Sequence, residues 1–179
     1  MKGVVFVALG EMIQDKFGHR IWNEIIVESN LESEGIYTTA ESYKDEEAIK
    51  LLNTISYKLK KKKSDVLKLF GIFLIKYFQN KMPHFFLNKN FDSFLDSIGS
   101  VVHLEIKKLS PENTPPQINT LRIDNKTTHV FYKSNRKLCA LAIGLIKGAS
   151  HIFNENIEVG HLKCMHEGHE ECELVIIKK

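Results

Sequence analysis

The fold class is decided by the stretch from Leu121 to Phe153, which reads LRIDNKTTHVFYKSNRKLCALAIGLIKGASHIF. Its first part has strand-forming residues on both sides of Asp124-Asn125, a pair that is typical of a tight turn. Its second part begins at Leu138 and has apolar residues at helical spacing. The stretch therefore predicts a β-hairpin followed by a strongly apolar helix.

The sequence on either side completes an α+β pattern. Upstream, several segments carry apolar residues at helical spacing, and the last of them is predicted to run from about Asn90 to Leu109, before Pro111. Downstream, two β-rich runs, from Ile157 to Met165 and from Cys172 to Ile177, lie on either side of a turn. We expect a helical N-terminal half followed by a small antiparallel sheet with one packed helix.

Cap and stop signals predict where the upstream helices begin or end. Apolar residues from Met12 to Ile26 predict one helical segment. Ser42, with Asp45 three residues later, predicts a capping box at the start of the next helix. Ser64-Asp65 is the cap candidate of a third helix, and Met82-Pro83 predicts its end.

Composition bounds the class of protein. The chain has 179 residues, enough for one domain with a buried core, and its formal net charge is only +3. This balance argues against a nucleic-acid binder, and the basic run from Lys58 to Lys63 is predicted to be a solvated helix end. No stretch approaches the roughly 20 apolar residues of a membrane span, and we recognise no signal peptide. We therefore expect a cytoplasmic protein with no membrane partner.

His103 is the first candidate for a functional site. On the helix expected over residues 90–109 it lies at the edge of an apolar stripe, and Gly99 one turn earlier leaves space for a flat group to approach the imidazole. A neutral imidazole is a natural axial ligand of haem iron. The alternative is a boundary histidine that is hydrogen-bonded to a neighbour. Because the chain has no Cys-x-x-Cys-His sequence, a haem would be held non-covalently, as haem b is.

Tyr132, Ser134 and Arg136 are the second candidate. They alternate at the end of the second predicted strand, and period-two spacing would point all three to one face. Two hydroxyls and a guanidinium suit a pair of carboxylates, such as the two propionates of a haem. The alternative is an ordinary solvated strand end.

The third candidate is a metal site in the tail. The chain has three cysteines, an odd number that does not suggest a disulfide scaffold. Cys164 and Cys172 are equidistant from Gly168, so that a hairpin turning there would bring the two thiols together across the sheet. Cys139 and His161 could complete a set of three sulfurs and one imidazole, which suits tetrahedral Zn²⁺.

The sequence leaves two questions about this metal site open. His161 and Cys164 have odd spacing, so that a regular strand would point them to opposite faces, and a bulge or turn must intervene. His166 and His169 compete with His161 for the fourth position. The alternative to a metal site is three free cysteines beside a histidine-rich loop.

Taken together, the motifs resemble those of the haem nitric oxide/oxygen binding (H-NOX) domains, which are related to the sensor domain of soluble guanylate cyclase. The resemblance covers essentially the whole chain, and its motifs occur in the right order. They are Met1-Lys2-Gly3, Trp22, Val102-His103-Leu104, Thr114-Pro115-Pro116, the Tyr-x-Ser-x-Arg-Lys run from Tyr132 to Lys137, and Gly144-Leu145-Ile146. Their number and order make the resemblance specific.

The resemblance implies a division of the chain. Haem is expected to be buried between a distal helical subdomain, residues 1–62, and a proximal α/β subdomain with a zinc-binding tail, residues 63–179. Both are parts of one domain over residues 1–179. A subset of stand-alone bacterial members has a similar tail, and its zinc ligands match Cys139, His161, Cys164 and Cys172.

The resemblance also implies roles for the residues around the haem. His103 is implied as the axial ligand, Pro116 as the residue that distorts the porphyrin, and Tyr132, Ser134 and Arg136 as the propionate clamp. The residues aligned with the distal pocket are Val5, Leu9, Leu74, Phe78, Leu141 and Leu145.

All six of these distal residues are apolar. Oxygen bound to ferrous haem carries partial negative charge, which a buried donor stabilises. Oxygen-binding members of the family have a tyrosine where this chain has Leu141. The resemblance therefore implies a sensor that binds NO and CO but forms no stable oxygen complex.

A signalling mechanism follows from the same resemblance. NO binding to the ferrous haem breaks the bond between the iron and His103, and the conformational change regulates a separate partner, since no output domain is evident in the chain. By resemblance that partner is a sensor histidine kinase, or a cyclic-di-GMP synthase or phosphodiesterase. The domain itself is not expected to be an enzyme.

Two other functions stay open. The tail is also similar to that of small vinyl-reductase-type domains, so that the chain could be a zinc-stabilised small-molecule-binding module without haem. A haem enzyme such as a peroxidase is the second. An apolar distal pocket counts against it, because peroxide chemistry needs acid–base groups near the iron.

Overall fold

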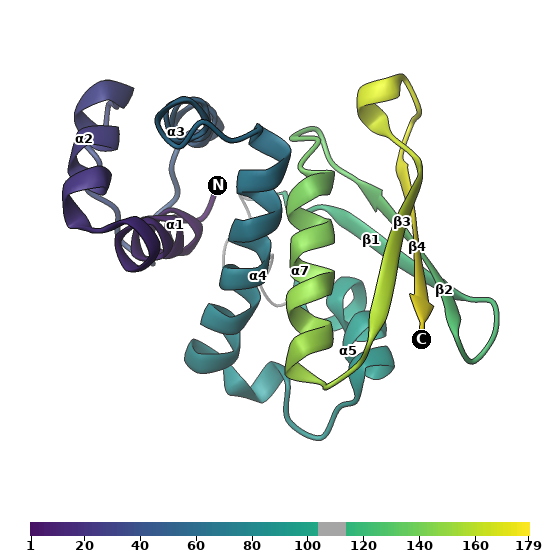
Figure 1. Cartoon of the computed structure of the whole chain (residues 1–179). Helices are drawn as coiled ribbons and strands as arrows, with labels where there is room; N and C mark the ends of the chain where they lie inside the picture. The colour runs from purple at the N-terminus through teal and green to yellow at the C-terminus, as the bar shows by residue number, and fades with distance from the viewer. Residues whose placement is uncertain (104–113) are drawn as a thin grey trace.

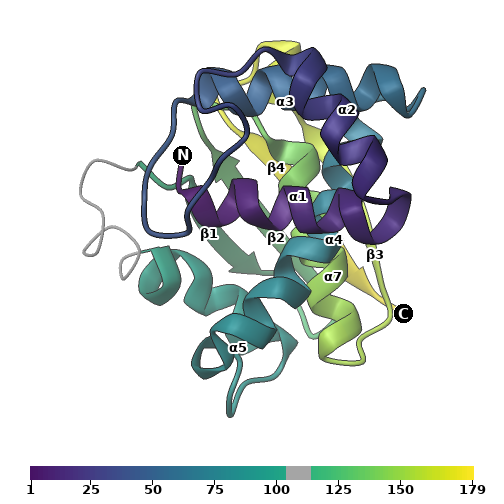
Figure 2. The same cartoon turned by 90° about the vertical axis from the view of Figure 1, so that its left-hand side faces the viewer.

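The structure is a computed structural model that describes residues 1–103 and 114–179, with Val101 and Val102 described by their backbone alone. Its N-terminal half consists of α1 (Gly3–Phe17), α2 (His19–Ser29), α3 (Asp45–Lys58) and α4 (Lys63–Lys81). Figure 1 shows α1, α2 and α3 on one side of α4, away from the sheet. Figure 2, seen from that side, shows these three helices in front of the sheet.

The C-terminal half is built around an antiparallel sheet. Its elements are η1 (Pro83–Phe85), α5 (Phe91–Ser97), the π-helical turn η2 (Ile98–Val102), β1 (Gln117–Arg122), β2 (Thr127–Lys133), α7 (Cys139–Ile152), β3 (Ile157–Lys163), η3 (Met165–Glu167) and β4 (Cys172–Lys178). The strand order is β1-β2-β4-β3, and every neighbouring pair is antiparallel. The predicted α+β architecture is confirmed, as are the hairpin, the helix after it and the two tail strands.

Two hydrophobic clusters fill the two halves, and α4 belongs to both. The first lies among α1, α2, α3 and α4, and its buried members include Phe6, Met12, Ile25, Leu51 and Phe70. The second lies between α4, α5, α7 and the inner face of the sheet, and includes Ile75, Phe94, Val130, Ile146 and Leu174. Because α4 is contacted on both sides, apolar residues cover most of its circumference.

α4 and α7 lie side by side in Figure 1 and pack backbone against backbone. A Cβ atom on Gly71 of α4 would lie 2.5 Å from the Leu141 carbonyl oxygen. One on Gly144 of α7 would lie 2.3 Å from the Lys68 carbonyl oxygen. Since no side chain fits at either position, these two glycines set the close approach of the helix that carries Leu141.

The first predicted helical segment is wrong in one respect. The stretch from Met12 to Ile26 belongs to two helices, because the backbone at Gly18 has a φ of 88°, which ends α1 and begins α2. A positive φ of this size is open to glycine at little cost, and it turns the chain between the helices. The glycine was visible in the sequence, but the apolar pattern continues across it.

Both predicted helix caps are also wrong. α3 begins at Asp45, with Lys44 as a cap that makes no side-chain hydrogen bond, so Ser42 and Asp45 form no capping box. α4 begins at Lys63, with Lys62 in the cap position, rather than at the predicted Ser64-Asp65. The carboxyl of Asp45 pairs instead with groups that lie far away in the sequence. The end of α4 at Lys81, before Met82-Pro83, is as predicted.

A buried carboxylate fixes the loop between α2 and α3. Glu47 is only 6% exposed. It accepts hydrogen bonds from the Ser33 backbone N–H at 3.1 Å, the Ser33 hydroxyl at 2.6 Å and the Tyr37 hydroxyl at 2.6 Å. Burial alone would raise the pKa of Glu47, but the hydrogen bonds from Ser33 and Tyr37 hold this pKa below its ordinary value. The charged form of Glu47 therefore stabilises the folded loop.

Replacing Glu47 by glutamine is expected to destabilise the protein. The amide weakens three hydrogen bonds to a charged group, so we expect the free energy of unfolding at pH 7 to fall by about 2 kcal/mol. Because the folded-state pKa is lowered, this difference from wild type should be complete above the unfolded pKa of about 4.3. It should disappear as the pH falls through the lower folded-state pKa.

Urea unfolding at several pH values measures the effect of Glu47→Gln. The matched control is Glu46→Gln, on the exposed neighbouring residue, which should change the free energy of unfolding by less than about 0.5 kcal/mol. Equal stabilities of the two variants at pH 7 would contradict the role given to Glu47.

Candidate functional site

His103 follows directly on the π-helical turn that continues α5. Asn90 and Ser93 form a capping box at the start of α5, in agreement with the predicted helix start. η2 then extends the helix to Val102, and π-turns are frequently found at functional sites. The part of the predicted helix beyond His103, to Leu109, and its stop at Pro111 lie outside the described residues.

The imidazole of His103 is half-buried, and one of its two nitrogens has no hydrogen-bond partner among the described residues. Its Nδ1 is buried and has no hydrogen-bond partner among the residues that the structure describes. Burial lowers the pKa of His103, and the Pro116 backbone carbonyl beside the ring opposes this shift only in part. The ring is therefore neutral at pH 7 and has a lone pair available for a metal. A buried nitrogen without a partner is unusual in a folded protein and indicates a missing ligand.

The role predicted for Gly99 is wrong. A Cβ atom at this position would lie 2.3 Å from the Ile118 carbonyl oxygen of β1. The space beside Gly99 is thus filled by the backbone of a strand and is not available to a flat cofactor. The glycine instead allows the helix that carries His103 to lie directly on β1.

The three predicted clamp residues come together, but not by strand alternation. β2 ends at Lys133, so that only Tyr132 belongs to the strand, while Ser134 and Arg136 lie in the turn after it. The Arg136 backbone N–H donates to the Ser134 hydroxyl at 3.2 Å, and the Leu138 backbone N–H donates to the Tyr132 hydroxyl at 3.1 Å. The turn holds the two hydroxyls and the guanidinium on one short segment.

Arg136 joins the two halves of the molecule. Its Nε donates to Asp45 Oδ2 at 2.7 Å, and its Nη1 donates to the Thr114 carbonyl oxygen at 2.7 Å. The Met1 amine lies 3.1 Å from the other carboxylate oxygen of Asp45. Burial alone would raise the pKa of Asp45, but Arg136 and the amine hold this pKa below its ordinary value. A guanidinium has five N–H donors, so that Arg136 can also bind a carboxylate of a ligand.

Asp45 is a site residue that the sequence did not reveal. Its position three residues after Ser42 indicated a helix cap, whereas its main partner, Arg136, is 91 residues away. No local pattern can report a contact at that separation. The sequence offered only a weak signal for this contact. Asp45 is an acidic residue near a helix start, and an acidic residue can pair with Arg136 of the Tyr-x-Ser-x-Arg-Lys run.

An apolar cavity of about 240 Å³ lies between α1, α3, α4 and α7. Arg136, Asp45 and Asn135 are the polar side chains that border it, and a cavity with few polar groups at its edge is typical of a ligand site. Of the predicted distal residues, Val5, Leu9 and Leu141 line the cavity. The other three are Leu74, Phe78 and Leu145, and all six pack in the same hydrophobic cluster.

The tail brings together four candidate metal ligands. They are Cys139, His161, Cys164 and Cys172, whose ligand atoms all lie within 4.8 Å of one another. The sulfur atoms of Cys139 and Cys164 are 4.0 Å apart. This is near the edge of a tetrahedron with zinc–sulfur distances of about 2.3 Å, which is about 3.8 Å.

A β-bulge makes this grouping possible. The register between β3 and β4 shifts between His161 and Lys163, as the odd spacing of His161 and Cys164 requires. His166, the competing histidine, places its Nε2 2.8 Å from the Lys137 carbonyl oxygen. Of the three histidines, His161 is therefore the one within the group.

The thiols of Cys139 and Cys172 are protonated in the absence of a cation. Burial raises the pKa of Cys139 to about 12, and the neighbouring Cys172 and Cys164 add to this effect. Burial also raises the pKa of Cys172. Three thiolates so close together need a bound cation to offset their repulsion and desolvation, and Zn²⁺ fits the donor set.

The fold and the site together define the class of protein. A helical half and a sheet half meet over an apolar cavity with a guanidinium at its edge, and a short segment from Thr114 to Pro116 links this edge to a neutral histidine. These features suit a ligand with an apolar body and an acidic edge. The sequence model of the Haem-NO-binding family (HNOB) matches residues 2–161, and the chain belongs to this family of haem-based gas-sensing domains.

Solved structures agree with this assignment. An H-NOX protein from Shewanella oneidensis in the Fe(II)NO ligation state is 32% identical, with a TM-score of 0.93 and with 100% of this chain and 99% of that chain covered. An Fe(II) unliganded H-NOX protein from K. algicida is 27% identical, with a TM-score of 0.90 and with 100% and 97% covered. The oxygen complex of an oxygen-binding H-NOX domain related to soluble guanylate cyclases is 25% identical, with a TM-score of 0.86 and with 100% and 95% covered. No curated protein matches the chain.

The family assignment settles the choice among the three functional classes. The domain binds haem and senses gases rather than catalysing a reaction, so neither the haem-free module nor the peroxidase is retained. Among the residues that the structure describes, no helix has the length and apolar character that crossing a membrane requires.

Proposed function

We propose that the domain senses nitric oxide through a non-covalent haem b whose iron is held by His103. The observation that carries this proposal is the state of His103, whose ring is neutral and whose buried Nδ1 has no partner among the described residues. Neutral imidazole is the form that ligates iron. The Pro116 backbone carbonyl lies beside the same ring, and in this proposal Pro116 would press on the porphyrin.

Tyr132, Ser134 and Arg136 form the clamp for the haem propionates in this proposal. Arg136 borders the cavity and pairs with Asp45, and its remaining N–H donors could bind a propionate. The hydroxyls of Tyr132 and Ser134 are held on the same segment by their hydrogen bonds to the backbone of residues 136 and 138. Binding of the propionates therefore acts on the contact that joins the two halves.

The apolar lining of the cavity supports a preference for NO and CO. Bound oxygen carries partial negative charge and is stabilised by a buried hydrogen-bond donor, whereas bound NO and CO do not depend on one. The six distal residues supply only aliphatic and aromatic groups. We therefore propose that the ferrous domain forms no long-lived oxygen complex.

In this proposal His103 connects the haem to the helix formed by α5 and η2, and this connection transmits the signal. When bound, haem would supply an iron at which NO can bind, and His103 would be the residue released from that iron. The helix formed by α5 and η2, together with the sheet on which it lies, could then shift relative to the N-terminal half of the domain. The signal passes to a separate protein, which we propose is a sensor histidine kinase or an enzyme that makes or degrades cyclic di-GMP.

Absorption spectra of the purified protein test this function. The reduced protein should be coloured, should change its spectrum on addition of NO and of CO, and should oxidise in air without a lasting oxygen spectrum. A protein that takes up no haem would overturn the proposal as a whole. A long-lived oxygen complex would overturn the selectivity.

Replacing Leu141 by tyrosine is expected to create an oxygen-binding site. The new hydroxyl lies on the cavity wall, and a hydrogen bond to a charged group is worth about 1.5–3 kcal/mol, so the lifetime of the oxygen complex should rise at least about tenfold. Stopped-flow absorption in air measures this lifetime. Leu141→Phe, which adds the ring without the hydroxyl, is the control and should leave the lifetime unchanged.

We further propose that Cys139, His161, Cys164 and Cys172 hold a structural Zn²⁺. The donor set and the sulfur–sulfur distance support a closed tetrahedral site. Such a site would tie the first turn of α7 to the ends of β3 and β4. A zinc ion there would stabilise the C-terminal half without taking part in gas binding.

A further inference from the structure

One face of the helix formed by α5 and η2 lies along β1. Asp92, Asp96, Gly99 and His103 are spaced four, three and four residues apart, which places them on one side of a helix. Asp92 and Asp96 contact the second half of β1, Gly99 lies against Ile118 near its start, and His103 lies beside Pro116 just before it. The helix that holds the iron ligand is therefore seated in fixed register on an edge strand of the sheet.

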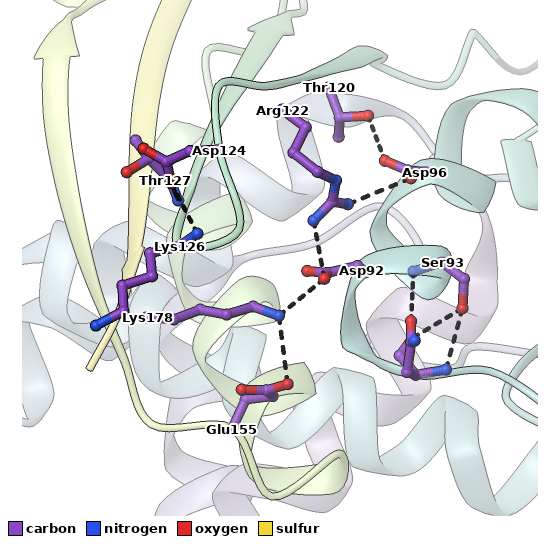
Figure 3. A network of polar contacts seen from close by, with 11 residues as sticks. Asp92, Ser93, Asp96, Thr120, Arg122, Asp124, Lys126, Thr127, Glu155 and Lys178 are labelled. Carbon is purple, nitrogen blue, oxygen red and sulfur yellow. Dashed lines mark hydrogen bonds and ion pairs between the residues drawn. The ribbon is translucent and has the colours of Figure 1, made fainter.

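Ion pairs fix the far end of this helix, as Figure 3 shows. Arg122 Nη1 on β1 and Lys178 Nζ on β4 each lie 2.8 Å from Asp92 Oδ2. Lys178 Nζ is also 3.3 Å from a carboxylate oxygen of Glu155, in the connection between α7 and β3. Asp92 thus links α5 to β1, to β4 and, through Lys178, to the residue that follows α7.

Asp96, one turn further along, makes a second connection to β1. The Thr120 hydroxyl donates to Asp96 Oδ1 at 2.6 Å, and Arg122 Nη2 lies 3.5 Å from Asp96 Oδ2. Arg122 therefore contacts both acidic residues on this face of the helix. These contacts of Asp92 and Asp96 with Thr120, Arg122 and Lys178 are called the helix latch below.

The part of the helix latch around Asp92 and Lys178 is partly withdrawn from water, whereas the side chain of Asp96 is 53% exposed. The side chains of Asp92 and Lys178 are 25% and 19% exposed, and Asp92 Oδ1 is buried without a hydrogen-bond partner among the described residues. Burial alone would raise the pKa of Asp92, but Lys178 and Arg122 hold this pKa below its ordinary value. Since screening by solvent is reduced here, the contacts hold the helix more firmly than surface ion pairs do.

We propose that the helix latch positions His103 by holding its helix on β1, so that the helix cannot follow the iron when NO binds. This inference rests on the proposed function, because it takes His103 to be the iron ligand. A helix that is fixed at one end resists displacement of His103 at the other end. This resistance would favour breaking of the bond between His103 and the iron. With the latch opened, the helix can move with the iron, and His103 stays bound more often.

Arg122→Gln and Asp92→Asn open the helix latch without a large change in side-chain size. Arg122→Lys keeps the charge and is the conservative variant that should restore most of the wild-type behaviour. Arg20→Gln is the matched control, because Arg20 forms an ion pair with Glu24 on α2 but is 89% exposed and lies in the other half. Asp92→Asn is the second variant if Arg122→Gln fails to fold.

Hydrogen exchange, read by mass spectrometry, measures the first effect. In the two opening variants the peptide covering residues 91–103 should exchange at least about threefold faster than in wild type, while peptides of α1 and α2 stay unchanged. The same difference is expected in haem-free and in reduced, haem-loaded protein. Exchange equal to that of Arg20→Gln would overturn the helix latch, whether or not the protein binds haem.

The absorption spectrum of the NO-loaded protein measures the second effect. It reports the fraction of molecules in which His103 remains bound, and the ratio of bound to released His103 should rise at least about threefold in the opening variants and return toward wild type in Arg122→Lys. A loss of stability alone would not move this ratio. An unchanged ratio together with faster exchange would overturn the positioning role, whereas a wild-type protein without haem would overturn the proposed function instead.

Discussion

Replacing His103 by glycine is expected to lower the haem content of the purified protein at least about tenfold, which corresponds to 1.4 kcal/mol of binding free energy. The reason is that His103 supplies the only protein bond to the iron in the proposed site, while the apolar cavity and the clamp around Arg136 remain. Because the lost side chain is half-buried, glycine leaves a space that free imidazole can enter. Added imidazole should therefore restore haem binding and the wild-type spectrum.

Haem content per chain and absorption spectra, with and without imidazole, measure this effect. His151→Gly is the matched control, since His151 is an exposed histidine in the last turn of α7 and its replacement also places a glycine in a helix. If His103→Gly had the haem content of the wild-type protein without imidazole, His103 would not be the iron ligand. Loss of haem without rescue, in a protein whose circular dichroism is unchanged, would also count against it.

Replacing Cys172 by alanine is expected to remove the bound zinc and to lower the thermal stability of the protein. Cys172 is fully buried at the start of β4, and the Met165 backbone N–H donates to its sulfur. Loss of one of four ligands opens a closed site, whose binding free energy contributes directly to folding. For a loss of about 3 kcal/mol, the melting temperature of a domain of this size should fall by about 10 °C.

Metal analysis and thermal unfolding measure the effect of Cys172→Ala. His169→Ala is the control, because His169 is an exposed histidine of the same loop that lies outside the group of four. It should leave both the zinc content and the melting temperature unchanged. If the wild-type protein were purified without zinc and took up none when zinc is added, the proposal of a zinc site would be wrong.

The sequence predicts those parts of the fold that depend on neighbouring residues. The hairpin turn is one example, because Asp124 Oδ1 accepts hydrogen bonds from the backbone N–H groups of Lys126 and Thr127, both at 2.7 Å. All the groups that form this turn lie within four consecutive residues. The apolar helix α7 is another, because its apolar residues recur at helical spacing along the chain.

Where a residue takes its partner from another element, local patterns were misleading. Asp45 was predicted to be the acidic residue of a capping box at the start of α3, but it contacts Arg136. Gly99 was predicted to make room for a cofactor, but it lies against Ile118 of β1. The acidic side chain of Asp45 and the missing side chain of Gly99 did indicate that each residue makes a close contact. Their partners could not be identified, because a sequence pattern carries no information about which distant backbone is near.

The group of four candidate metal ligands has features that the sequence predicts and one that it does not. The spacing of Cys164 and Cys172 around Gly168, and the need for a bulge after His161, follow from strand geometry and agree with the structure. The choice of His161 over His166 could not be made from spacing. It depends on the Lys137 carbonyl, which lies near His166 only in the folded chain.

The position of β4 has a consequence for how the chain folds. β4 is the last strand in sequence but pairs with both β2 and β3, so that it lies inside the sheet. During synthesis from the N-terminus, β2 and β3 have no strand between them until residues 172–178 have been made. Pairings across such separations are slow to form, and the helical half can assemble earlier because its contacts are more local. Until β4 has been made, the nascent chain exposes two strand edges, which leaves it open to aggregation.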